Sequence, residues 1–352
     1  MNKKIIYTND CFEMAEKKCH LRDDIPGVIL RVKYSGLCGT DVRIVRRERG
    51  HDTFILGHEG CTLVEMHNSD KIKEKPGDRI FINPNPRALT KHKGHIGHDR
   101  PGMFQKYLYL SEEDYFSHFG CLIPNEISDL ESVFLESWSC CMHTIGKLSL
   151  DVWLNSKIAI FGAGHMAASH ILALNNIGVN SDNIFLFNRS PLRLNYIAHK
   201  LCLNKCNTFV IGNILANFKS FFDIIILTNS EAYTYINEAI VYVNNYGKIL
   251  IFGGISTNYK ITGISQTFDM LDIRLNEKNL LCKMHDKDVA LIGTRSFVEQ
   301  DVRLAIERCR SNKTNFLSLL GDVLSTDDFI YTLNSIKRSK TTEYLGKQIC
   351  VF

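Results

Sequence analysis

Short apolar runs between turn residues dominate the first third of the chain. Gly27–Tyr34 alternates apolar with polar residues, which is typical of a strand. Residues 60–82 predict two more strands around the turn Lys75–Asp78, and Met103–Leu110 predicts another. From Ser128 onward the apolar spacing becomes helical. We therefore expect a β-rich region that ends in a helix.

The middle third alternates strands with helices, and the last third is mixed. Buried strands of the parallel type are predicted at Lys157–Phe161, Asn183–Phe187, Phe222–Leu227 and Lys248–Phe252. The last third predicts strands at Val289–Ile292 and Gln348–Phe352, and amphipathic helices at Phe297–Cys309 and Thr326–Lys337. The alternation in the middle predicts an α/β region with a doubly wound parallel sheet of the Rossmann type.

The first strand of this α/β region runs directly into a glycine-rich turn. Gly162 permits the tight turn, Gly164 lets the backbone approach phosphates, and Ala167 stands where a third glycine is usual. A predicted helix follows at once, so its first amides could bind a dinucleotide pyrophosphate. His165 and Met166 lie within this turn, and we count them among the candidate cofactor-binding residues.

The end of the second predicted strand bears on the choice of cofactor. NAD enzymes usually place a carboxylate there, but this chain has Asn188, Arg189 and Ser190, with Arg193 one turn further on. Arginine and neutral polar groups accommodate a 2′-phosphate, so the pattern favours NADP(H) over NAD(H). The alternative is that Asn188 binds the ribose hydroxyl of NAD and Arg189 is a solvated charge.

Three metal-binding side chains lie close together near the N-terminus. Cys38, His58 and Glu59 offer a thiolate, an imidazole and a carboxylate, a mixed set that suits a catalytic Zn²⁺. Thr40 places a hydroxyl two residues beyond the thiolate, and Asp41 could hold the outer nitrogen of His58. A lone cysteine or histidine would mean little, because such residues are often simply buried.

Two further segments contain residues that could bind a metal, but each also has a simpler interpretation without one. Glu136 is a carboxylate on an otherwise apolar helix. It is either a fourth metal ligand or a partner of one, or else a capped or surface-facing glutamate. His92, His95 and His98 repeat every third residue in a polar loop. A structural zinc site nearly always uses thiolates, and none is nearby, so a loop of free or cleft-facing histidines is the simpler expectation.

Composition limits the class of protein. At 352 residues the chain exceeds one ordinary hydrophobic core, so two domains are expected. The net charge of +4 is too small to imply nucleic acid, and no apolar run approaches the roughly 20 residues that span a membrane. The N-terminus lacks the apolar region of a signal peptide. Twelve scattered cysteines show no framework spacing, so free thiols in a reducing cytoplasm are expected.

Together these motifs resemble the zinc-dependent medium-chain dehydrogenase/reductase superfamily over nearly the whole chain. The matching segments are Gly36–Asp41, Gly57–Gly60, Gly77–Ile80, Glu136 with His143, Gly162–Ala167, Gly253–Gly254 and Gly293–Thr294. The resemblance implies a GroES-like catalytic domain formed by residues 1–147 and 295–352. A Rossmann domain, residues 148–294, would be inserted between them.

The resemblance also implies roles for individual residues. Cys38, His58 and Glu136 would hold one catalytic zinc, Glu59 would be an exchangeable ligand, and Thr40 would begin a proton relay. Gly253 and Arg295 would join the cofactor site, and the protein would form a homodimer or homotetramer. The cysteines of the family's structural zinc lobe are missing here, so that lobe should be metal-free.

The substrate is the least determined feature. Arg43, Arg46 and Arg47 would share one face of a helix near the zinc thiolate, as a phosphate clamp or as a solvated basic surface. Trp138 could narrow the substrate pocket or be a core aromatic. A sugar or polyol, or the phosphate of one, is favoured over a small secondary alcohol or its ketone. A pseudoenzyme that binds nucleotide without turnover is a third alternative, against which the intact ligand set argues.

Overall fold

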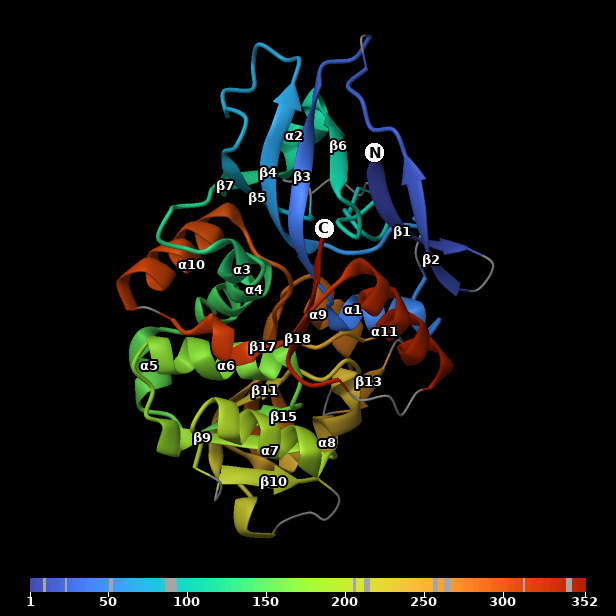
Figure 1. The fold of residues 1–352 in the computed structure, drawn as a ribbon. Coiled ribbons are helices and arrows are strands. Elements are labelled where there is room, and N and C mark those ends of the chain that lie inside the picture. The colour runs from blue at the N-terminus through green and yellow to red at the C-terminus, as the bar shows by residue number, and fades with distance from the viewer. Residues whose placement is uncertain are drawn as a thin grey trace. The chain divides into compact units, whose positions relative to one another are not determined.

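The computed structural model divides into two compact units. It describes residues 1–8, 11–22, 24–50, 53–85, 94–204, 207–211, 216–255, 259–262, 267–312, 314–339 and 344–352. One unit comprises Met1–Ser137 with Val298–Phe352, and the other comprises Trp138–Phe297. The chain therefore leaves the first unit, builds the second and returns (Figure 1). The divisions lie at 137/138 and 297/298 rather than at the expected 147/148 and 294/295.

The first unit is built on a seven-stranded sheet. Its strands run in the order β17-β18-β3-β4-β5-β7, with β6 paired to β3, and β1 and β2 form a separate hairpin. The strands are β1 (Asn2–Thr8), β2 (Cys11–Lys17), β3 (Gly27–Gly36), β4 (Glu59–His67), β5 (Arg79–Ile82), β6 (Tyr107–Ser111), β7 (Phe119–Leu122), β17 (Leu320–Leu324) and β18 (Lys347–Val351). The final strand of the chain thus lies beside one of the first strands, as the resemblance required.

Helices and short turns accompany this sheet. They are α1 (Gly39–Val45), α2 (Glu112–His118), α3 (Asp129–Ser132), α10 (Glu299–Asn312), η5 (Phe316–Leu319) and α11 (Thr326–Arg338), while α4 (Leu135–Ile145) begins in this unit. Val28, Leu30 and Val32 of β3 are fully buried in one apolar cluster, in agreement with their alternation along the sequence.

The predicted strand Met103–Leu110 is shorter in the structure, and the difference has a physical reason. Met103 and Phe104 donate their backbone N–H groups to the carbonyls of Gly57 and Leu56, at 2.8 and 2.9 Å. These bonds hold the segment that precedes His58, and the ladder with β3 therefore begins only at Tyr107.

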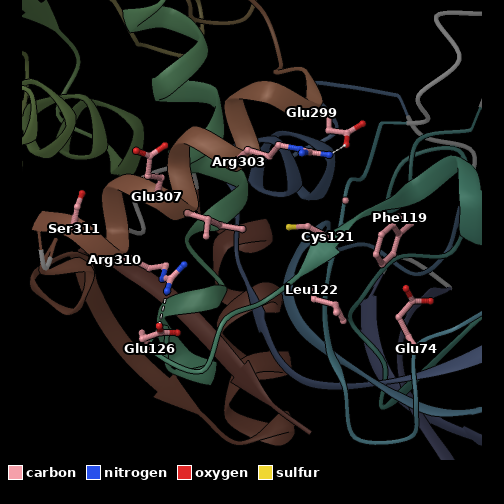
Figure 2. A pocket seen from close by; sticks show the side chains of 12 residues that line it. Glu74, Phe119, Cys121, Leu122, Glu126, Glu299, Arg303, Glu307, Arg310 and Ser311 are labelled. Carbon is pink, nitrogen blue, oxygen red and sulfur yellow. Dashed lines mark hydrogen bonds and ion pairs between the residues drawn. The ribbon is translucent and has the colours of Figure 1, made fainter.

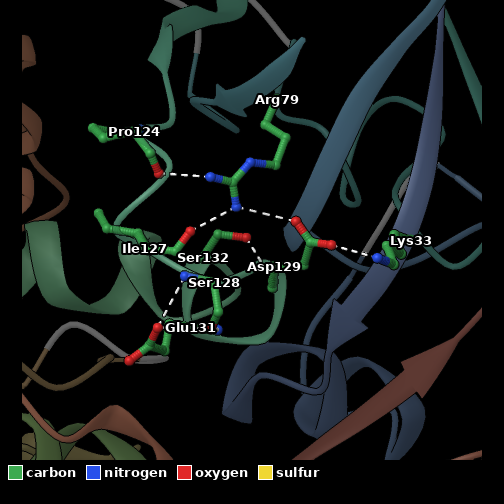
Figure 3. A network of polar contacts seen from close by, with 8 residues as sticks. All are labelled: Lys33, Arg79, Pro124, Ile127, Ser128, Asp129, Glu131 and Ser132. Atoms are coloured by element: carbon green, nitrogen blue, oxygen red, sulfur yellow. Dashed lines mark hydrogen bonds and ion pairs between the residues drawn. The ribbon is translucent and has the colours of Figure 1, made fainter. Parts of the chain in front are cut away.

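A polar network anchors the chain as it enters α3 and α4 (Figure 3). Arg79 of β5 donates to the carbonyls of Pro124 and Ile127, each at 2.6 Å, and to the carboxylate of Asp129 at 3.1 Å. Lys33 of β3 pairs with the other oxygen of Asp129. Two strands of the sheet thus fix the start of the helical segment that carries Glu136.

The second unit confirms the predicted Rossmann sheet. Six parallel strands run in the order β10-β9-β8-β11-β12-β16, and β15 adds an antiparallel edge. The strands of this sheet are β8 (Ile158–Phe161), β9 (Ile184–Asn188), β10 (Thr208–Val210), β11 (Phe222–Leu227), β12 (Val243–Ile251), β15 (Asn279–Met284) and β16 (Lys287–Gly293). A separate antiparallel pair consists of β13 (Lys260–Thr262) and β14 (Thr267–Asp269). The reversal of strand order beside β8 creates the switch point at which such sheets bind ligands.

The helices and short turns of the second unit connect these strands. They are α5 (Leu150–Leu154), α6 (His165–Asn176), η1 (Ser181–Asn183), α7 (Pro191–Lys200), η3 (Ala216–Phe218), η4 (Ala232–Tyr235), α8 (Ile236–Tyr242) and α9 (Met270–Leu275). None of the helices described above is long and apolar enough to cross a membrane. The cysteines in the described ranges are free thiols.

Candidate metal centre and nucleotide site

Cys38 and Asp41 together begin helix α1. The Cys38 thiol accepts a hydrogen bond from the Thr40 backbone at 3.5 Å, and Asp41 accepts one from the Cys38 backbone at 3.0 Å. This reciprocal pattern is a capping box in which cysteine takes the place of serine. The other oxygen of Asp41 accepts the N–H of Gly57 at 3.3 Å. Asp41 therefore ties the two motif segments together from a fully buried position.

His58 lies beside Asp41 in this buried setting. Its Nδ1 is 3.6 Å from Asp41 Oδ1, and the side chain is 5% exposed. Burial lowers the pKa of His58, but the Asp41 and Cys38 charges outweigh this effect and raise the pKa well above its usual value. The predicted contact between Asp41 and His58 is thus present as a charge pair rather than as a short hydrogen bond.

Cys38, His58 and Glu59 form a donor group that fits a metal ion. One ligand atom from each lies within 4.8 Å of the other two. In the described part of the chain, His58 Nδ1 and Glu59 Oε1 are buried and have no hydrogen-bond partner. Thiolate, imidazole and carboxylate are all ligands of zinc in proteins. A buried carboxylate oxygen without a hydrogen-bond partner costs free energy unless a cation lies beside it.

Glu136 lies outside that donor group. It is half-buried near the start of α4, and its charge helps to raise the pKa of Lys347. Its assignment as a zinc ligand therefore stays a prediction from the resemblance. Thr40 is half-buried in the first turn of α1, close to the thiol as expected.

Lys347 is a member of the site that the sequence did not reveal. Its ammonium pairs with Glu59, and both side chains are 1% exposed. Burial lowers the pKa of Lys347, but Glu59 and other nearby negative groups reverse the effect and raise it. The only signal in the sequence is a lysine within the otherwise uncharged final strand.

Two members of the histidine loop, His95 and His98, lie beside His58. His98 is 7% exposed, and its ring meets that of His58 edge-on at 5.1 Å between centroids. His95 stacks on His98 at 4.0 Å, and burial first, then His58 and Arg49, lower the pKa of His95 to about 3. One donor atom each of Asp41, His58 and His98 lies within 4.8 Å of the others. The third histidine, at position 92, falls outside the described residues.

The glycine turn of the second unit has the geometry that the motif predicted. Gly162 adopts φ +117°, and a Cβ there would lie 2.6 Å from Thr228 Oγ1. Gly164 caps α6, and a Cβ built there would meet no atom of the described residues within 4 Å, which is compatible with a phosphate at the helix N-terminus. His165 and Met166 form the first turn of that helix.

The residues expected to select the cofactor lie at the end of β9. Asn188 donates to the Ser190 carbonyl at 3.4 Å, and Ser190 caps α7 by accepting the Arg193 N–H at 3.4 Å. Arg189 is exposed, and its guanidinium lies over the ring of Tyr235 at 5.9 Å from the centroid. Tyr235 had no signal in the sequence.

Arg295 and Gly253 follow two other strands of the same sheet. The Arg295 N–H donates to Glu277 at 3.0 Å, and the same carboxylate oxygen contacts His143 Nε2 at 2.7 Å and Lys147 at 3.2 Å. Gly253 donates to the Leu227 carbonyl at 2.7 Å, beside the end of β11. His143, which matched a family motif, thus supports the segment after β16 through Glu277.

The structure corrects the expected arginine face. Helix α1 ends at Val45, Arg46 is its C-cap, and Arg47 adopts φ +58°. Arg43, Arg46 and Arg47 therefore do not share one helical face. Trp138 is buried at 1% exposure, as a core aromatic would be.

A separate cavity of about 850 Å³ in the first unit contains none of these residues (Figure 2). It lies between β7 and α10, where Glu299 pairs with Arg303 and Glu126 with Arg310. Because it holds no candidate catalytic group, we do not assign the reaction to it.

Comparison with known proteins supports the geometry. Residues 25–118 match the alcohol dehydrogenase GroES-like domain. L-threonine 3-dehydrogenase of Rhizobium rhizogenes is 24% identical over 269 residues, 70% of this chain and 74% of that protein. By these matches the chain is similar to the zinc-dependent medium-chain dehydrogenase/reductase superfamily, whose members include alcohol and polyol dehydrogenases.

Two solved structures share its fold over the full chain. Galactitol-1-phosphate dehydrogenase from Escherichia coli has a TM-score of 0.77 at 16% identity, covering 100% of both chains. A protein of Sinorhizobium meliloti 1021, solved bound to NADP, has a TM-score of 0.76 at 17% identity, covering 100% of this chain and 99% of its own. At these identities the likeness shows the fold alone.

Proposed function

We propose that this protein is a zinc-dependent dehydrogenase of that superfamily, which interconverts a phosphorylated sugar or polyol and its carbonyl form, with NADP(H) as the hydride carrier. The observation that carries the substrate class is the position of the basic segment after α1 relative to His95. The charge of Arg49 in that segment contributes to lowering the pKa of His95, and the His95 ring lies 5.8 Å from that of His58 between centroids. These contacts support a charged substrate group near the proposed metal ligands.

The metal would be held by Cys38, His58 and Glu136, with Glu59 as an exchangeable ligand. Zinc would supply Lewis acidity toward the substrate oxygen. The chain's own residues prepare that position. Asp41 fixes Cys38 through the backbone and His58 through its charge, and Lys347 holds one oxygen of Glu59.

Thr40 is the proposed first proton acceptor from the alcohol. It lies in the first turn of α1, and its backbone N–H already binds the Cys38 thiol. Its hydroxyl can both accept and donate a proton, which suits a relay. His58, Asp41 and Glu59 beside the thiol are buried, whereas Thr40 is half-buried, so its hydroxyl is the group placed to pass a proton outward.

The cofactor proposal rests on the end of β9. Among Asn188, Arg189 and Ser190 there is no carboxylate to repel a 2′-phosphate, and Arg189 is exposed beside the switch point. Gly164 and the first turn of α6 would receive the pyrophosphate. Gly253 and Arg295, at the ends of β12 and β16, would complete the nucleotide site.

The test compares a pentulose 5-phosphate with the unphosphorylated sugar, using NADPH and the zinc-loaded enzyme. We expect the phosphate to raise kcat/KM, and Arg49→Ala, Arg43→Ala or Arg46→Ala to remove most of that gain. Arg303→Ala is the matched control, because Arg303 is an exposed arginine already paired with Glu299. If the phosphate gives no gain, or no variant alters it, a small secondary alcohol or ketone becomes the better substrate class.

Assembly into a homodimer or homotetramer is part of the same proposal. Light scattering of the purified chain would decide it, and a monomer at micromolar concentration would contradict it.

A further inference from the structure

The environment of Arg189 contains an aromatic partner with no assigned role. Tyr235 ends η4 and caps the N-terminus of α8, far in sequence from β9. The Arg189 guanidinium lies 5.9 Å from the centroid of its ring. A cation over an aromatic face is attracted by the ring quadrupole, and tyrosine is a good partner for arginine.

Tyr235 is itself rigidly held. Its side chain is 6% exposed, and its ring lies 5.8 Å from that of Phe161, which directly precedes the glycine turn. Burial raises the pKa of Tyr235, although the charge of Arg189 and a hydrogen bond from its side chain oppose the effect, so the phenol is neutral at physiological pH. The ring is therefore a fixed, uncharged platform between the glycine turn and the end of β9.

Arg189, in contrast, is exposed. A long exposed side chain normally samples many rotamers, and binding must then order it at an entropic cost. Contact with a fixed ring on one side reduces that cost and leaves the rest of the guanidinium accessible. A guanidinium positioned in this way can form the parallel N–H contacts that suit a phosphate.

We propose that Tyr235 is a positioning residue for cofactor selection, which holds the Arg189 guanidinium ready for the 2′-phosphate of NADP(H). The inference rests on the proposed preference for NADP(H). It adds a residue on a different strand connection, β11 to α8, to the determinants of that preference.

The experiment measures dissociation constants of NADPH and NADH by fluorescence titration in the full-length protein, without substrate. Tyr235→Leu removes the ring, and Tyr235→Phe keeps it. Tyr233→Leu is the control, because Tyr233 lies in the same short helix but stacks on Tyr259 at 5.0 Å. Thermal unfolding of each variant shows whether the unit stays folded.

Tyr235→Leu should weaken NADPH binding about two- to fivefold, as expected for an exposed cation–π contact, and leave NADH unchanged. Tyr235→Phe should lose less, and Tyr233→Leu should change neither constant. In an Arg189→Ala background, Tyr235→Leu should cause no further loss. An equal loss for both cofactors, or the same loss without Arg189, would overturn the positioning role.

Arg189→Ala separates this inference from the cofactor proposal. If Arg189→Ala selectively weakens NADPH but Tyr235→Leu does not, only the role of Tyr235 is wrong. If Arg189→Ala has no selective effect, the NADP(H) preference is wrong, and the role of Tyr235 is wrong with it.

Discussion

Replacing Lys347 by methionine should destabilise the metal-free protein severely. Lys347 of β18 and Glu59 of β4 form an ion pair in which each side chain is 1% exposed. Methionine keeps most of the lysine volume but leaves the Glu59 carboxylate without its cation. The other oxygen, Oε1, already lacks a hydrogen-bond partner among the described residues, so no second group compensates the charge.

The size of the effect follows from this burial. Removing one partner of a buried ion pair costs about 3–5 kcal/mol in the free energy of unfolding. For a unit of this size, each kcal/mol lowers Tm by about 2–4 °C, so a fall of about 6–20 °C is expected. The pKa of Lys347 is raised, so its contribution to stability is complete at neutral pH and is lost only as pH rises through that raised value.

The assay is urea and thermal unfolding of the full chain after chelator treatment, with hydrogen exchange reporting on β4 and β18. The double variant Lys347→Met, Glu59→Met is the control, since replacing both charges by apolar groups is often neutral or stabilising. It should recover most of the loss. A single variant that loses less than about 1 kcal/mol, or a double variant no better than the single, would refute this account of the pair.

Three further predictions concern the metal, the cofactor and acid stability. Cys38→Ser and His58→Ala should each abolish bound zinc and turnover while circular dichroism shows an intact fold; wild-type zinc content in either variant would mean that the site is misassigned. Arg189→Ala should weaken NADPH binding about tenfold to a hundredfold and scarcely affect NADH, as measured by titration. Although burial raises the pKa of Asp129, Lys33 and Arg79 lower it below its ordinary value, so Asp129→Asn should cost stability above about pH 5. That difference should shrink as pH falls below about 4, and a difference independent of pH would contradict the charge network.

The parallel sheet could be predicted because its signal is local. Phe222–Leu227 is apolar apart from Asp223, and β11 has the same bounds. The glycine turn was equally readable, since Gly162 adopts a positive φ that other residues rarely tolerate. In both cases a short stretch of chain determines the structure by itself.

The misread elements depended on distant contacts. Arg43, Arg46 and Arg47 fit a helical pattern, but α1 stops at Val45 and the chain turns through Arg47. Met103 and Phe104 looked like a strand, but their N–H groups bind Gly57 and Leu56 instead. Neither outcome is encoded in the spacing of apolar residues.

The site residues that escaped prediction share the same cause. Lys347 and Glu59 are 288 residues apart, and their pairing exists only because β18 returns to the sheet beside β3. Tyr235 meets Arg189 across a strand connection. A motif shows which residues can bind a metal or a nucleotide, but only the fold shows which residues hold them.

Glu59 takes part both in the buried ion pair with Lys347 and in the proposed metal site. One of its oxygens is held by Lys347, while the other is buried and unsatisfied in the described structure. If both oxygens of the carboxylate had protein partners, neither would be available to a metal ion. If neither oxygen had a partner, the buried charge would destabilise the strand. The observed half-satisfied state keeps Glu59 in position beside Cys38 and His58 and leaves an oxygen available. This is the arrangement that the proposed role of Glu59 as an exchangeable ligand requires, and it gives the buried lysine a function that a neutral residue could not supply.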